Sequence, residues 1–174
     1  MKRIITVLLL SVFMVSCGGS NQVVKQSRKT LKGYWNLDNI NYNNAPGVYD
    51  VTLFGDASSE CMVGSTWRFI PNNNFGNYEI TDGSCALGKR YFVWSIPAQE
   101  SATSYDILLK PTDEKMNSTM NNAGFRLNIN YLSENELTFT QTVQVDGKPF
   151  TIVMNFSKIS RYFDIPMLER TVHI

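Results

Sequence analysis

Residues 31–40 read LKGYWNLDNI, and the alternation in this stretch recurs along the rest of the chain. Apolar residues and glycine occupy one parity and polar residues the other: Leu31, Gly33, Trp35 and Leu37 against Lys32, Asn36 and Asp38. A period of two predicts a β-strand with one buried face. Gly33 stands two residues before Trp35, where a missing side chain lets the backbone pack closely beside the indole ring.

The rest of the chain continues as short alternating segments with turn residues between them. These segments lie at residues 48–54, 65–70, 75–81, 91–96, 104–110, 124–131, 136–145 and 149–159. Asp146-Gly147 joins the last two and is a two-residue loop suited to a type I′ hairpin turn. No helical period of useful length interrupts the series.

This spacing predicts an all-β fold. A flat antiparallel meander with one apolar face would leave that face in water, whereas closure into a barrel buries it and removes the sheet edges. We therefore expect an antiparallel up-and-down β-barrel of about eight strands over residues 31–159, with a short C-terminal extension. An immunoglobulin-like sandwich is the alternative, but the two internal cysteines lie close across a hairpin rather than between two sheets.

The N-terminal residues have the pattern of an exported lipoprotein. Lys2 and Arg3 precede an apolar run at residues 4–15, which is shorter than the ~20 residues of a membrane-spanning helix. Residues 14–20, MVSCGGS, resemble the bacterial lipobox, which implies a signal peptide at residues 1–16 and lipid attachment to Cys17. A plain secretory signal cut near Cys17 is the alternative.

The polar residues 17–30 have no period and are expected to form a flexible tether between the anchor and the barrel. Gly18 stands where enteric bacteria place aspartate to retain a lipoprotein in the inner membrane. By that analogy we expect a membrane-anchored lipoprotein of the cell envelope, in the outer membrane.

Cys61 and Cys85 are expected to form a disulfide, since an exported protein meets an oxidising environment. Residues 65–70 and 75–81 read as a hairpin around 71–74, in which the numbers of facing residues sum to about 145. The residue numbers of Cys61 and Cys85 sum to 146, so the two cysteines should lie nearly opposite each other at the open end of the hairpin. Two free thiols are the alternative.

Charge and composition argue against several functions. Removal of residues 1–16 leaves 16 − 2 = 14 basic against 15 acidic side chains, a net charge of −1, which offers no electrostatic footprint for nucleic acid. The single histidine, His173, is next to the C-terminus, so the sequence offers neither a hydrolytic triad nor a zinc ligand set. We expect a monomer without catalytic residues, metal or cofactor.

Several short motifs together resemble the lipocalin-like lipoproteins common in Bacteroidetes. They are Gly33-Tyr34-Trp35, the lipobox, Cys61, residues 64–69 (GSTWRF), residues 76–78 (GNY) and Cys85. The likeness covers residues 31–159, although the Thr-Asp-Tyr motif of the middle strands is absent. Lipocalins also place a basic residue over the first-strand tryptophan, and Lys158 and Arg161 are the candidates here.

The resemblance implies a cup that binds a small apolar or amphipathic molecule, closed at its bottom by Gly33 and Trp35. Side chains of inward parity would line the cup: Trp67, Phe69, Tyr78, Trp94, Tyr105, Phe125 and Tyr131. The same rings could instead fill the barrel, leaving a surface module that binds a protein or glycan through its loops. Exposed loop aromatics would favour that second function, and Tyr42, Tyr49 and Phe54 are the candidates. The apolar residues 160–174 are expected to pack on the barrel.

Overall fold

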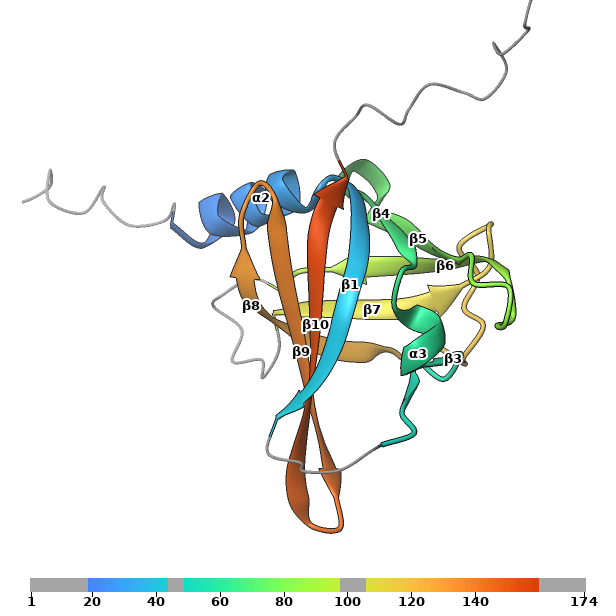
Figure 1. Cartoon of the computed structure of the whole chain (residues 1–174). Helices are drawn as coiled ribbons and strands as arrows, with labels where there is room; N and C mark the ends of the chain where they lie inside the picture. Colours follow the sequence, from blue (N-terminus) through green and yellow to red (C-terminus); the bar gives the residue numbers. More distant parts are fainter. Residues whose placement is uncertain (1–18, 44–48, 98–105, 160–174) are drawn as a thin grey trace, which may run out of the picture.

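A computed structural model describes residues 19–43, 49–97 and 106–159, and these form a closed antiparallel barrel (Figure 1). Its strands, in chain order, are β1 (Gly33–Asn43), β4 (Thr66–Ile70), β5 (Phe75–Ile80), β6 (Gly88–Ser95), β7 (Ile107–Thr112), β8 (Phe125–Leu132), β9 (Glu136–Val145) and β10 (Lys148–Ile159). Each strand pairs with its neighbour in sequence, and β1 closes the ring by pairing with both β4 and β10. The predicted eight-stranded up-and-down barrel is confirmed.

The β4–β5 hairpin has the register that the sequence predicted. Trp67 faces Tyr78 and Thr66 faces Glu79, around a short 3-10 helix, η2 (Pro71–Asn73). Cys61 and Cys85 form the predicted disulfide, with 5.8 Å between their Cα atoms. A crosslink that closes a loop of this length stabilises the fold by about 3 kcal/mol in the chain-entropy model.

The turn between β9 and β10 also follows the prediction. Asp146 and Gly147 have φ angles of 51° and 73°, the two positive values that a type I′ turn requires. Val145 pairs with Lys148 directly across this turn, and the two strands stay paired as far as Glu136 and Ser157.

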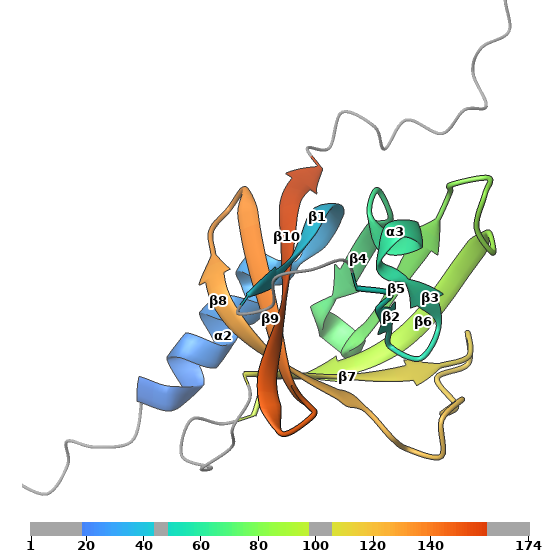
Figure 2. The ribbon, with the colours of Figure 1, turned by 60° about the horizontal axis from the view of Figure 1, so that its bottom comes forward.

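A second strand was predicted at residues 48–54, but the described part of that segment, residues 49–54, does not join the barrel. Only β2 (Thr52–Leu53) forms, and it pairs with β3 (Ala57–Ser58) in a separate two-stranded sheet (Figure 2). The short helix α3 (Ser59–Met62) follows and leads into β4. The expectation was wrong because Leu53 and Phe54 are consecutive and both buried, which breaks the alternation that a barrel strand needs.

The expectation of a flexible tether at residues 17–30 was also wrong for most of that segment. Residues Gly19–Leu31 form the helix α2, which ends directly before β1 (Figure 1). Arg28 donates hydrogen bonds to the carbonyl of Pro71 and to Asn74, and Leu31 is fully buried. Tertiary contacts of this kind stabilise a short helix of largely polar sequence.

The end of the barrel nearest α2 is closed around Trp35, which is fully buried. Its indole Nε1 donates to the carbonyl of Leu31 over 2.8 Å, and the Nζ of Lys158 lies 4.0 Å from the centre of its ring. Lys158 also donates to the carbonyls of Thr30 and Lys32. Of the two basic candidates Lys158 therefore covers the tryptophan, while Arg161 lies outside the described residues.

Gly33 is required at this closed end for two reasons. Its φ angle of +118° is one that residues with a side chain rarely adopt, and a Cβ would stand 3.3 Å from Cε of Lys158. The spacing from Gly33 to Trp35 thus leaves room for the lysine that packs over the ring.

Several predicted features lie outside the described residues. They are the signal peptide at residues 1–16, Cys17, Tyr105 and the tail at residues 160–174. No helix in the three described ranges is long and apolar enough to cross a membrane.

Candidate ligand-binding site

A pocket of about 510 Å³ opens at the end of the barrel where β4 begins, away from η2 and α2. Its volume lies within the range of small-molecule sites, ~300–1,000 Å³. Aromatic and aliphatic side chains of five neighbouring strands form its walls: Trp67, Tyr78, Phe92, Leu109 and Phe125. Charged residues lie around them, so the pocket combines an apolar interior with a polar rim.

Residues 52–58, which we call the lid, bring Phe54 into this pocket. The Phe54 side chain is only 5% exposed, and its ring centre lies 5.6 Å from that of Trp67 and 5.3 Å from that of Phe125. Phe54 and Gly55 have φ angles of 54° and 65°, and the amide of Asp56 donates to the carbonyl of Leu53 across the turn. A phenylalanine in the left-handed region is strained, so its packing in the pocket must hold it there.

The lid also carries a carboxylate that joins two side chains of the barrel wall. Oδ2 of Asp56 accepts a hydrogen bond from the Tyr78 hydroxyl at 2.8 Å and another from Nε of Arg90 at 3.0 Å. Burial, together with the hydrogen bond to Asp56, raises the pKa of the Tyr78 phenol well above its ordinary value of 10.0. The phenol therefore remains protonated and acts as a hydrogen-bond donor at neutral pH.

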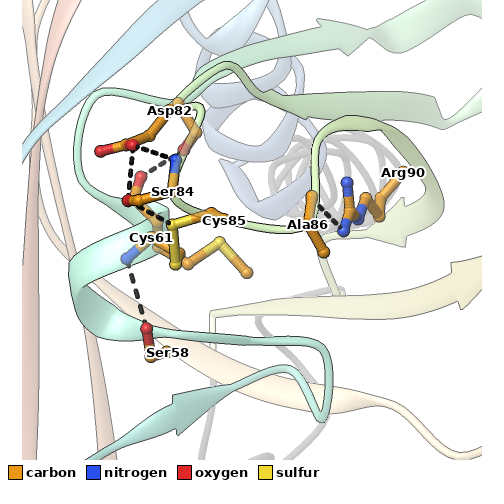
Figure 3. The surroundings of a disulfide bond; sticks show 9 residues. Ser58, Cys61, Asp82, Ser84, Cys85, Ala86 and Arg90 are labelled. Carbon is orange, nitrogen blue, oxygen red and sulfur yellow. Dashed lines mark hydrogen bonds between the residues drawn. A yellow bond between two sulfur atoms is a disulfide. The ribbon is translucent and has the colours of Figure 1, made fainter.

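Arg90 is held in place by the loop that precedes β6. Its two terminal nitrogens donate to the carbonyls of Gly88 and Ala86, at 2.8 and 2.7 Å. Figure 3 shows Ala86 next to the Cys61–Cys85 disulfide, with Arg90 reaching back toward it. The disulfide thus ties α3, which follows the lid, to the loop that orients the guanidinium.

Two of the other charged residues of the rim, Asp113 and Lys89, have partners, whereas Glu114 has none among the described residues. Asp113 accepts from the backbone amides of Lys115 and Asn117 and from the side-chain amide of Asn117. These hydrogen bonds, those from Asn117 first, lower the pKa of Asp113 below its ordinary value of 3.8. Lys89 lies 3.9 Å from Glu79, in a pair that is about half exposed.

Five of the seven predicted lining residues divide into two groups. Trp67, Tyr78 and Phe125 do line the pocket. Phe69 and Trp94 are buried but lie outside the pocket wall: their rings pack on each other at 5.7 Å, and Arg28 of α2 lies over Trp94. The barrel is therefore filled toward α2 and hollow under the lid. The expectation of a filled barrel describes the first half, and the expectation of an open cup describes the second.

Tyr131 was placed wrongly in the barrel interior. It is 52% exposed, because the pairing of β8 with β9 shifts by one residue between Ile129 and Tyr131. Such a bulge reverses the parity of the residues that follow it. Leu132 consequently packs against the core in place of Tyr131.

Sequence reasoning missed several residues of the pocket. Phe92 and Leu109 lie on the inward parity of segments already predicted as strands, so their alternation could have identified them. Phe54, Asp56 and Met120 come from loops, and Arg90 comes from the first half of β6, where no local pattern marks them. No cluster of three or more potential metal ligands occurs among the residues that the structure describes.

A comparison with protein-family models agrees with this architecture. A family model described as a lipocalin-like domain matches residues 31–139, which run from the last residue of α2 into β9. One similar solved structure is a lipocalin-like protein from Bacteroides uniformis, 13% identical, with a TM-score of 0.44 over 75% of this chain and 99% of that chain. The search of curated proteins found no match. Since the matched segment spans more than half of the sequence and most of the barrel, the chain belongs to the lipocalin-like domain family.

Proposed function

We propose that this protein is a lipid-anchored, monomeric carrier that binds a small apolar or amphipathic molecule in the pocket beneath the lid. The observation that carries the proposal is the 510 Å³ space walled by Trp67, Phe92, Leu109 and Phe125. The role is one of binding rather than catalysis, and it needs neither metal nor cofactor. The lipocalin-like fold is compatible with such a ligand.

The expected affinity follows from the apolar surface that the pocket can bury. Each 100 Å² of ligand surface removed from water gains about 2.5 kcal/mol, less the cost of ordering the ligand and the lid. A medium-length alkyl chain that displaces Phe54 would exchange the contacts of the Phe54 ring with the pocket wall for contacts of the chain with the same wall. We therefore expect affinities on the order of micromolar rather than nanomolar.

The proposed anchor is the lipidated Cys17. Residues 14–17 support it through their resemblance to a lipobox, and several acyl chains would hold the protein on a membrane. We propose the outer membrane as its location. The Cys17→Ser variant should move to the soluble fraction after cell lysis, and unchanged partitioning of that variant would refute the anchor.

The alternative function, a surface module that binds a protein or glycan, receives less support from the loop aromatics. Phe54 is buried in the pocket rather than displayed. Tyr42 and Tyr49 pack on each other and on Phe150, with ring centres 5.0 to 5.8 Å apart. The rings of Tyr42, Tyr49 and Phe150 therefore stabilise the fold instead of forming an exposed aromatic patch.

Titration of the Cys17→Ser protein with decanoate and with decanol tests the carrier function. Trp67 lines the pocket, so its emission should change in a saturable manner, and the change should disappear in Trp67→Phe. Trp94→Phe is the matched control, because Trp94 lies outside the pocket and its removal should leave the response intact. No saturable response to either probe, with no small molecule in extracts of the purified protein, would reject the carrier in favour of the surface module.

A further inference from the structure

Two hydrogen-bond donors of the barrel wall converge on a single oxygen atom, and that atom belongs to the lid. The Tyr78 hydroxyl and Arg90 Nε both donate to Oδ2 of Asp56. Tyr78 and Arg90 also border the pocket, together with Asp56 itself. The carboxylate oxygen thus marks a position in the pocket wall where one neutral and one cationic donor meet.

The two donors would keep their positions if the lid moved. Tyr78 is 6% exposed and its ring stacks on Trp67 at 4.7 Å, while Arg90 is held by the carbonyls of Ala86 and Gly88. The lid, in contrast, pairs with no barrel strand among the described residues. Its strands β2 and β3 contain two residues each, and its turn includes the strained Phe54.

Charge at this point of the pocket selects the kind of ligand. Without Asp56, the guanidinium of Arg90 and the protonated Tyr78 hydroxyl would face the ligand. Among the other charged residues of the pocket, the Asp113 carboxylate is engaged by its own turn, Lys89 lies beside Glu79, and Glu114 belongs to the loop after β7 rather than to the strands that carry Tyr78 and Arg90. One cation and one neutral donor match a group with a single negative charge and do not match an amine.

We propose that Tyr78 and Arg90 form a headgroup site for an amphiphile with a carboxylate, and that Asp56 fills this site in the unliganded protein. The ligand carboxylate takes the place of the Asp56 carboxylate, and the alkyl chain takes the place of the Phe54 ring beside Trp67 and Phe125. The displaced Asp56 passes into water, where a carboxylate is well solvated. This inference rests on the proposed function and adds the chemical class of the ligand.

The test compares decanoate with decanol in the Cys17→Ser protein and uses the ratio of their affinities, since a looser lid would change the binding of both probes together. Asp56→Asn removes the competing charge and should increase the preference for decanoate by about tenfold. Arg90→Gln should reduce that preference by about tenfold. Arg68→Gln is the matched control, because Arg68 is exposed on β4, over the ring of Tyr34, and should leave the ratio unchanged.

Tyr78→Phe provides a second test, because Arg90→Gln also removes hydrogen bonds to the loop before β6 and can affect folding. Loss of the Tyr78 hydroxyl should reduce decanoate binding more than decanol binding. Saturable binding of both probes with a ratio that none of the three variants alters would overturn the headgroup site but leave the carrier function standing. Absence of binding by both probes would overturn the carrier function and the headgroup site together.

Discussion

Replacement of Phe54 tests whether packing in the pocket holds the lid in a strained conformation. Phe54 is 5% exposed and contacts Trp67, Tyr78 and Phe125. Truncation of a buried phenylalanine to alanine costs about 3 to 5 kcal/mol. Because the pocket borders the side chain and water can enter the vacated space, we expect Phe54→Ala to cost about 3 kcal/mol, at the lower end of that range.

The sharper expectation concerns glycine at the same position. The left-handed backbone at φ +54° costs a residue with a Cβ about 1 to 2 kcal/mol, and alanine retains this cost whereas glycine does not. The greater freedom of glycine in the unfolded chain offsets about 0.5 to 1 kcal/mol of the gain. Phe54→Gly should therefore be more stable than Phe54→Ala by about 0.5 to 1 kcal/mol, the reverse of the usual order.

Urea unfolding with the disulfide intact, followed by tryptophan emission, measures both variants. The pair Phe125→Ala and Phe125→Gly is the control, since Phe125 lies in strand β8 with an ordinary extended backbone and glycine should there be the less stable variant. A Phe54→Gly protein less stable than Phe54→Ala would refute the strain. A loss of less than about 1 kcal/mol for Phe54→Ala would refute the packing of the lid.

Three further predictions concern the barrel. Gly76→Ala should destabilise the fold by about 2 kcal/mol in chemical denaturation, because its Cβ would stand 2.4 Å from the Phe92 ring; Phe92→Leu in the same chain should recover part of the loss. Lys158→Met should reduce the free energy of unfolding by about 1 to 2 kcal/mol, because it removes two hydrogen bonds and the cation over Trp35. Lys158→Arg keeps the charge and should cost less. Equal losses for the two variants would contradict a role for the charge. The pKa of Asp113 is lower in the folded protein than its ordinary value of 3.8. Its contribution to stability should therefore be complete above pH 3.8 and disappear as the pH falls through the lower, folded-state pKa. Amide NMR shifts of its turn that titrate at or above pH 3.8 would contradict this.

The sequence alone was sufficient to predict the barrel, because alternation is a local signal. Each strand pattern repeats every two residues, and the short turns at residues 71–74 and 146–147 fix the register of their hairpins. The Cys61–Cys85 pairing followed from that register. Trp35 and its glycine could be read from the first strand, although only the structure identified Lys158 as the cation above the ring.

The closed end and the pocket depended on tertiary structure. Helix α2 forms from a polar segment because Arg28 and Leu31 find partners on the barrel, and nothing within the segment itself reveals those partners. A one-residue bulge turned Tyr131 outward, since parity fails as a guide wherever a strand gains a residue. The pocket that supports the proposed function shares this dependence. Asp56 lies 22 residues before Tyr78 and 34 before Arg90, and these side chains meet only because closure of the barrel brings β5 and β6 beneath the lid.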